Sequence, residues 1–122
     1  MLVDDSETIR AMLKRTLEMT GLQIDSIITA SNGIEALEKM KKTWVDIVLT
    51  DIHMPQMSGI ELIDAMCKDA GLADIPVVIV STEGSSKRIE ELIKKGVRGY
   101  LRKPFTPESI RDVIVETLGE WT

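Results

Sequence analysis

Acidic, hydroxyl and lysine side chains occur in this sequence directly after four separate apolar runs, where strands are expected to end. They are Asp4 and Asp5 after 1–3, Asp51 after 45–50, Ser81 and Thr82 after 75–80, and Lys103 after 97–101. In open α/β sheets the carboxyl ends of the strands meet at one edge, which is where ligands bind. We therefore expect these side chains to form one site.

The three aspartates of this group suggest a cation site. Carboxylates that are about 4 Å apart repel each other by on the order of 4 kcal/mol at an effective dielectric near 20. Oxygen-only ligands favour Mg²⁺, with Mn²⁺ as the alternative, over zinc, which prefers His and Cys. The competing interpretation is that these are unrelated surface aspartates at the starts of loops.

The lysine and the hydroxyl add the groups that a phosphoryl transfer needs. An aspartate can accept a phosphoryl group covalently, and such transfers depend mainly on positioning and charge neutralisation. In this arrangement Lys103 neutralises one phosphoryl oxygen and Ser81 donates a hydrogen bond to another. Asp51 is thus a candidate phosphoacceptor.

The elements that must position these residues alternate between strand and helix patterns. The strands are predicted at 1–3, 23–30, 45–51, 75–80 and 97–101, and the helices at 7–20, 34–42, 59–70, 86–95 and 107–118. Helix starts are predicted from Ser6, Ser58 and Ser85, and helix ends from Gly21, Gly71 and Gly96. This alternation predicts an α/β fold with a parallel sheet and helices on both faces.

Composition narrows the class of protein. The 122 residues, 43% of them hydrophobic, fit a single domain over 1–122, and the net charge of −5 argues against direct nucleic-acid binding. The sequence contains no apolar run of about 18 residues and no leader pattern, so we expect a cytoplasmic protein without membrane insertion. Cys67 cannot form an intrachain disulfide and is expected to be a buried, small apolar side chain.

The order and spacing of the motifs resemble a known family. The motifs are Asp4-Asp5-Ser6, Asp51-x-x-Met54-Pro55-x-Met57-x-Gly59, the hydroxyl after the fourth strand, and Lys103-Pro104-Phe105. Together they are similar to the receiver domain of bacterial two-component response regulators, especially single-domain chemotaxis regulators of the CheY type. The resemblance covers essentially the whole chain. It implies a flavodoxin-like (βα)5 three-layer sandwich with a five-stranded parallel sheet of order 2-1-3-4-5.

The resemblance also implies a role for each acidic residue. Asp51 would be the phosphoacceptor, and Asp5 and Asp51 would bind Mg²⁺ directly. Asp4 would act largely through water, and the backbone carbonyl of His53 would supply a further ligand. The His53 side chain either alters water access to the acyl phosphate or is an exposed loop residue.

Further residues match the family's switch positions. Lys103 would stabilise the phosphoryl group, and its bond to Pro104 would be cis. Ser81 is expected to be the switch hydroxyl in preference to Thr82, because adjacent strand residues face opposite ways. Tyr100 would be the switch aromatic, against the alternative of an ordinary half-buried tyrosine. Glu83, two residues after Ser81, either modulates the phosphate or has no role.

The implied function is signalling. A sensor histidine kinase of the CheA type would donate the phosphoryl group, and the face formed by 86–95, 97–101 and 107–118 would then change. In chemotaxis, that face would contact a flagellar motor switch protein or a phosphatase. The other roles open to such a protein are an intermediate in a relay, a phosphate sink, or the receiver part of a longer regulator. The protein would be a monomer, and it would not be an enzyme beyond assisting its own phosphotransfer and dephosphorylation.

Two other functions and one departure from the family remain. A phosphatase that uses Asp51 as a transient nucleophile would need an acid at the position of His53 and a cap segment. A pseudo-receiver that only binds partners usually lacks the acceptor, the acidic pair or the lysine, and all are retained. Only three residues precede Asp4, whereas the first strand of the family usually begins several residues earlier. A trimmed chain would explain this short strand, and a strand exchanged between subunits is the alternative to a monomer.

Overall fold

The computed structural model describes residues 1–82 and 86–119, except for the side chain of Ser86. Strands and helices alternate along the chain, as expected for the α/β class. They are β1 (Leu2–Val3), α1 (Glu7–Glu18), β2 (Thr29–Ala30), α2 (Gly33–Lys42), β3 (Val48–Thr50), α3 (Gly59–Cys67), β4 (Val77–Ser81), α4 (Ser86–Lys94), β5 (Gly99–Arg102) and α5 (Pro107–Leu118). Within the described residues, no helix has the length and apolar character needed to cross a membrane.

The five strands form one parallel sheet with the order β2-β1-β3-β4-β5, which confirms the predicted topology. The short strand β1 lies inside the sheet, where Leu2 pairs with Thr29 on one side and with Leu49 on the other. The first and third strands are therefore neighbours although Val3 and Val48 lie 45 positions apart in the sequence. This order brings the end of β1 beside the end of β3.

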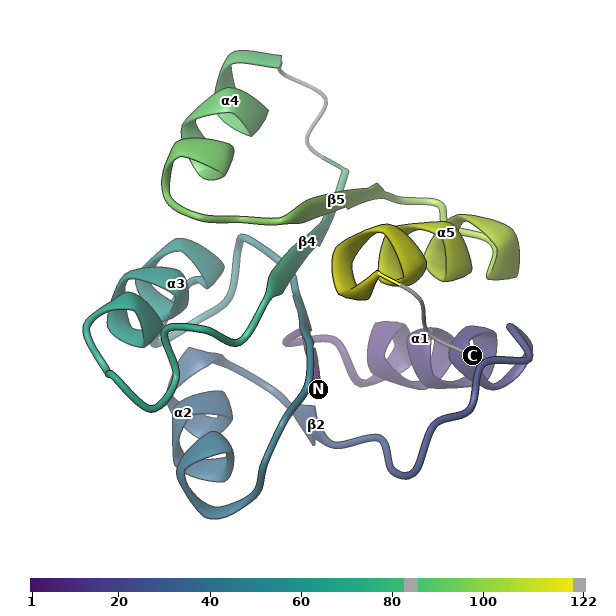
Figure 1. Cartoon of the computed structure of the whole chain (residues 1–122), viewed down its shortest axis with the longest axis horizontal. Coiled ribbons are helices and arrows are strands. Elements are labelled where there is room, and N and C mark those ends of the chain that lie inside the picture. The colour runs from purple at the N-terminus through teal and green to yellow at the C-terminus, as the bar shows by residue number, and fades with distance from the viewer. Residues whose placement is uncertain (83–85, 120–122) are drawn as a thin grey trace.

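Helices cover both faces of the sheet (Figure 1). Helices α1 and α5 pack on one face, and α2, α3 and α4 contribute to the core on the other. The buried strand β4 shows the alternation directly, because Val77 and Ile79 belong to the second core and Val78 and Val80 to the first. A strand buried on both faces reads as a continuous apolar run, which is why it was recognisable in the sequence.

Strands β2 and β3 are several residues shorter than predicted, whereas the other strands are shorter by one residue. The prediction of a strand over 23–28 is wrong, since β2 comprises Thr29 and Ala30 alone. Among the strands that the structure describes, β2 pairs with β1 alone, and the register that places Thr29 opposite Leu2 leaves 23–27 without β1 residues opposite them. Strand β3 begins at Val48 and not at Val45 for a similar reason. Hydrophobic pattern marks a segment as strand-like, but a ladder also needs a partner.

Helix starts are better predicted than helix ends. The hydroxyls of Ser6 and Ser58 accept hydrogen bonds from the amides of Ile9 and Glu61, which confirms both caps. Helix α3 ends at Cys67, four residues before the predicted stop at Gly71. The predicted cap Ser85 lies outside the described residues.

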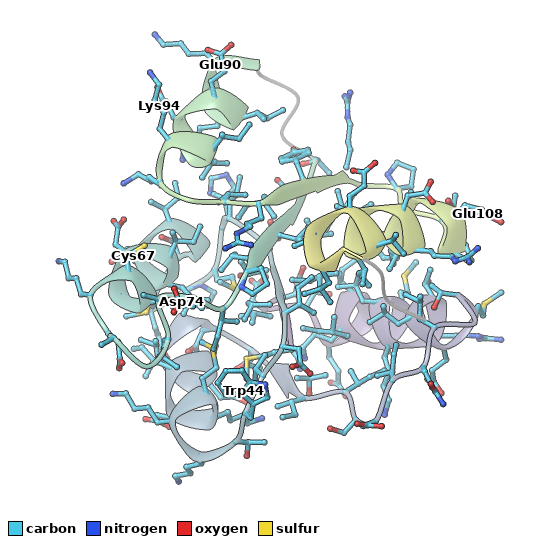
Figure 2. The ribbon with its side chains drawn as sticks, in the orientation of Figure 1. Trp44, Cys67, Asp74, Glu90, Lys94 and Glu108 are labelled. Atoms are coloured by element: carbon cyan, nitrogen blue, oxygen red, sulfur yellow. The ribbon has the colours of Figure 1, made fainter. Side chains whose placement is uncertain are left out.

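The expectation that Cys67 is buried is wrong. It is exposed on the outside of α3 (Figure 2), while its neighbour Met66 is 2% exposed. Leu62, Ile63 and Met66 form the buried side of α3, and Cys67, turned by about 100° from Met66, lies outside it.

Gly59 occupies a position with no room for a side chain. A Cβ there would overlap the backbone carbonyl oxygen of Asp51 and lie 3.1 Å from the Cα of Ile52. We expect Gly59→Ala to lower the free energy of unfolding in urea by about 3 kcal/mol, the upper end of overpacking costs. Gly71→Ala is the control, because its Cβ would meet only the side chain of Asp69 at 3.3 Å. Equal losses in the two variants would contradict the steric explanation.

Candidate functional site

The structure places the predicted polar residues at one edge of the sheet. Asp4 directly follows β1, Asp51 directly follows β3, and Lys103 directly follows β5. Ser81 is the last residue of β4, and its carbonyl accepts a 2.9 Å hydrogen bond from the backbone N–H of Lys103. Parallel pairing of the strands therefore brings these residues together from distant parts of the sequence.

The Lys103 ammonium lies between two carboxylates. Its Nζ is 3.2 Å from Oδ2 of Asp4 and 3.3 Å from Oδ2 of Asp51. The Asp4 side chain is 2% exposed, and those of Lys103 and Asp51 are 17% and 16% exposed. Such partly buried ion pairs are screened less by water and salt than surface pairs. The lysine thus links the end of β5 to the ends of both β1 and β3.

The surroundings of Lys103 favour its charged form. Burial alone would lower the pKa of Lys103, but the charges of Asp51 and Asp4, and the hydrogen bonds that they accept, raise it above the ordinary lysine value. Lys103 therefore stays protonated throughout the neutral pH range. It can neutralise negative charge that arrives at Asp51.

Asp4, Asp5 and Asp51 form a cluster of carboxylates. One oxygen of each lies within 4.8 Å of the others. Oxygens on opposite sides of an octahedral Mg²⁺ are about 4.2 Å apart, since each bond is about 2.1 Å long. The cluster contains neither His nor Cys, and one lysine does not balance three carboxylates. Its donor set and excess charge therefore fit a hard divalent cation.

The two hydroxyl candidates differ clearly in burial. Ser81 is 3% exposed, whereas Thr82 lies after the end of β4 and is exposed. Adjacent residues that face opposite ways account for this difference, and Ser81 is also the residue whose backbone carbonyl accepts the hydrogen bond from the N–H of Lys103. The structure is consistent with the choice of Ser81, whose role stays a prediction.

The remaining predicted residues lie around this centre. Tyr100 on β5 is half-buried and packs against the core that α2, α3 and α4 cover. The His53 side chain is exposed in the loop between β3 and α3. The peptide bond between Lys103 and Pro104 is cis, as the resemblance implies. Glu83 lies outside the described residues.

Comparison with known proteins identifies the family. The model of the response regulator receiver domain matches residues 1–115. The chain belongs to this family. It is 36% identical over 120 residues to a chemotaxis protein CheY homolog of Campylobacter jejuni, with 98% of this chain and 91% of that protein covered. It is also 33% identical to chemotaxis protein CheY1 of Helicobacter pylori, with 98% and 95% covered.

Solved structures agree with this assignment. The chemotaxis protein CheY4 of Vibrio cholerae is 34% identical to the chain, with a TM-score of 0.85 and 96% and 95% of the two chains covered. A response regulator receiver domain protein from Clostridium thermocellum is 28% identical, with a TM-score of 0.82 and 96% and 90% covered. The family assignment favours the phosphoacceptor hypothesis over the phosphatase and the pseudo-receiver.

Polar contacts also hold the two loops of this receiver domain that carry its carboxylates. Nη1 of Arg10 donates a 2.6 Å hydrogen bond to the backbone carbonyl of Asp4. In the loop after β3, the side-chain amide of Asn32 donates a 3.2 Å hydrogen bond to Oε1 of Gln56. The backbone of Gln56 lies in the left-handed region, with a φ of +66°. None of these contacts was predicted from the sequence. The one signal was the placement of Arg10 near a helix N-terminus, where a cation is unfavourable.

A partly enclosed cavity lies away from the acidic cluster. It has a volume of about 250 Å³ and lies near the amino ends of the strands, where Met1, Ile24, Ile27, Ile47 and Leu118 contribute to its lining. The acidic cluster is instead the site with convergent charged groups. Chemistry, and not cavity size, identifies the functional site of this domain.

The cluster should reduce stability when no cation is bound. We expect Asp5→Asn to raise the free energy of unfolding in EDTA by about 1 kcal/mol, because the repulsion at about 4 Å lies between about 1 kcal/mol in water and about 4 kcal/mol at a dielectric of 20. In saturating MgCl₂ this advantage should disappear, since binding stabilises the wild type. The measurement is urea unfolding in both solutions.

Asp74→Asn is the matched control for Asp5→Asn. Asp74 is exposed in the connection between α3 and β4 (Figure 2), so its substitution should change stability in neither solution. If Asp5→Asn were less stable than the wild type in EDTA, repulsion within the cluster would be refuted.

Glu35 supplies a pH-dependent contribution at the β2–α2 turn. Hydrogen bonds from Ser31, and then the nearby Lys39 ammonium, lower the pKa of Glu35 from 4.5 to about 2. A carboxyl group whose pKa is lower in the folded state than in the unfolded state stabilises the fold at pH values above the unfolded-state pKa. This contribution is lost as the pH falls from about 4.5 to about 2. In urea unfolding at several pH values, Glu35→Gln should depend less on pH in this range than the wild type or Glu38→Gln. Parallel curves for all three proteins would contradict this assignment.

Proposed function

We propose that Asp51 receives a phosphoryl group from the phosphohistidine of a sensor histidine kinase, and that 1–122 form one receiver domain. The observation that carries this proposal is the Lys103 ammonium, held 3.3 Å from Asp51 and 3.2 Å from Asp4 beside a third carboxylate. The lysine provides a fixed positive charge at the point where transferred phosphoryl oxygens would arrive. Catalysis of phosphoryl transfer depends mainly on such positioning and electrostatics.

The transfer step needs no proton from the receiver. A carboxylate oxygen of Asp51 attacks phosphorus, the new O–P bond forms, and the P–N bond to the donor imidazole breaks. The electron pair of that bond leaves with the imidazole nitrogen. Lys103, which its environment keeps protonated, faces the phosphoryl oxygens, and Ser81 donates a hydrogen bond to one of them.

Asp4, Asp5 and Asp51 would hold Mg²⁺, with Asp5 and Asp51 as direct ligands, Asp4 acting largely through water, and the His53 carbonyl as a further ligand. The oxygen donors of the cluster suit Mg²⁺, and Mn²⁺ could replace it. The bound ion would neutralise charge on the phosphoryl oxygens. Removing it with EDTA should therefore stop phosphorylation, while the protein remains folded.

The signal would leave through the face formed by α4, β5 and α5. On this face Ile93 is 59% exposed, and Glu90 and Lys94 point outward from α4 (Figure 2). Ser81 and Tyr100 would be the switch residues at its inner side, and Thr82 and Glu83 would modulate them. A phosphoryl group that binds one of two pre-existing states better would shift the population toward that state.

Chemotaxis is the role that the relatives support, because both curated proteins named above are chemotaxis proteins and the chain covers more than nine-tenths of each. The upstream partner would be a kinase of the CheA type. The downstream partner would be a flagellar motor switch protein, with a phosphatase removing the signal. Assistance by the receiver to its own phosphorylation and dephosphorylation belongs to the same proposal.

Phosphorylation can be tested without identifying the kinase. Incubation with MgCl₂ and acetyl phosphate should increase the mass of the wild-type protein by one phosphoryl group. Asp51→Asn should abolish the increase, because an amide oxygen cannot act as the nucleophile, while Asp74→Asn should retain it. Mass spectrometry of the intact protein gives the result. An unmodified wild type, or a phosphorylated Asp51→Asn variant, would contradict the assignment.

A further inference from the structure

Asp4 and Asp5 lie in the short connection between β1 and α1. Strand β1 ends at Val3 and α1 begins at Glu7, so neither aspartate is part of the strand or the helix. Asp4 is nevertheless fixed at several atoms. Its N–H donates to the carbonyl of Ala30, its Oδ1 accepts from the N–H of Ser6, and its Oδ2 accepts from Lys103.

Asp5 lacks comparable support for its side chain. It is exposed, and within the described part of the chain the structure shows no hydrogen bond or ion pair to its carboxylate. The direction of this carboxylate therefore depends on the orientation of its backbone. The peptide group that joins Asp4 to Asp5 sets that orientation. It is planar and contains both the carbonyl of Asp4 and the N–H of Asp5, so fixing the carbonyl also fixes the nitrogen of Asp5.

Arg10 holds this peptide group. From α1, its Nη1 donates a 2.6 Å hydrogen bond to the Asp4 carbonyl oxygen, and the side chain is half-buried. A cation four residues after the N-cap Ser6 is opposed by the partial positive charge of the helix N-terminus. The contact to the carbonyl, together with the neighbouring carboxylates, offsets this cost.

We propose that Arg10 is a positioning residue for the cation site, which orients the Asp5 carboxylate by fixing the peptide bond between Asp4 and Asp5. This inference extends the proposed function and rests on the acidic cluster acting as a divalent-cation site. Contacts that orient metal ligands commonly change metal affinity by about 10- to 100-fold when they are removed. Arg10 acts on the backbone of a ligand, so the lower end of this range applies.

The direction of the effect separates positioning from charge. A cation near the site repels Mg²⁺, so removal of the Arg10 charge alone would tighten binding. Loss of orientation would weaken it. We expect Arg10→Met to raise the Kd for Mg²⁺ about 10-fold in isothermal titration calorimetry. Arg15→Met is the control, because it removes the same charge from an exposed position on α1 and should leave the Kd within about 2-fold of the wild type.

A kinetic measurement distinguishes positioning from general damage to the fold. With acetyl phosphate, Arg10→Met should need about 10-fold more Mg²⁺ for half-maximal phosphorylation, yet reach the wild-type rate at saturating Mg²⁺. Calorimetry tests Arg10 even if Asp51 is never phosphorylated, so failure of this inference and failure of the proposed function can be told apart.

Arg10→Lys covers the case in which Arg10→Met does not fold. It keeps the charge and the aliphatic stem but lacks the planar guanidinium, so a Kd raised about 3-fold would support positioning. An unchanged or tighter Kd in Arg10→Met, or a wild-type Kd in Arg10→Lys when only that variant folds, would overturn the inference.

Discussion

The structure depends on one lysine that lies between two aspartates. Three carboxylates converge at one edge of the sheet, and Lys103 supplies positive charge to two of them, Asp4 and Asp51. Without it, Asp4 would be a buried carboxylate whose side chain, among the described residues, keeps one hydrogen bond, from the amide of Ser6. Burial of an unpaired charge is expensive, so the ends of β1, β3 and β5 are held together by the requirement that these charges be balanced.

The backbone is arranged to keep this charge balance in place. Gly59 lets the start of α3 approach the carbonyl of Asp51 more closely than any side chain would allow, and its N–H bonds the carbonyl of Ile52 at 2.8 Å. The N–H of Ile52 in turn donates to Oδ1 of Asp51 at 2.7 Å. One carboxylate oxygen therefore contacts its own loop and the other contacts Lys103, so the orientation of the Asp51 carboxylate is set from both sides before any ligand binds. Preorganisation of this kind removes the need to order the site during the reaction.

Much of this arrangement could be predicted from the sequence, because its causes are local or follow from topology. The alternation of apolar strands and amphipathic helices predicts a parallel sheet, and parallel strands place Asp51 and Lys103 at the same edge. The strand order came from the resemblance to receiver domains. The wrong predictions have a common origin in pairing and packing that no local pattern records: the length of β2 depends on its β1 partner, and the exposure of Cys67 depends on which side of α3 faces the sheet. The reach of Arg10 back to Asp4 is likewise a property of the folded turn.

The same lysine explains how a local change of charge would reach a distant surface. Lys103 directly follows β5, its backbone N–H is bonded to the carbonyl of Ser81, and β4 and β5 are paired from Val78–Gly99 to Ser81–Arg102. A phosphoryl group on Asp51 would place new negative charge where Lys103 now meets Oδ2, so the ammonium would have to divide its contacts differently between Asp4 and the phosphoryl oxygens. If Lys103 moves with its backbone, the shift passes directly to β5, because Lys103 follows the last residue of that strand. Tyr100 pairs with Ile79 within this ladder and packs on the core beneath α4, so the ladder is a continuous physical connection from the acceptor to the face that a partner would contact.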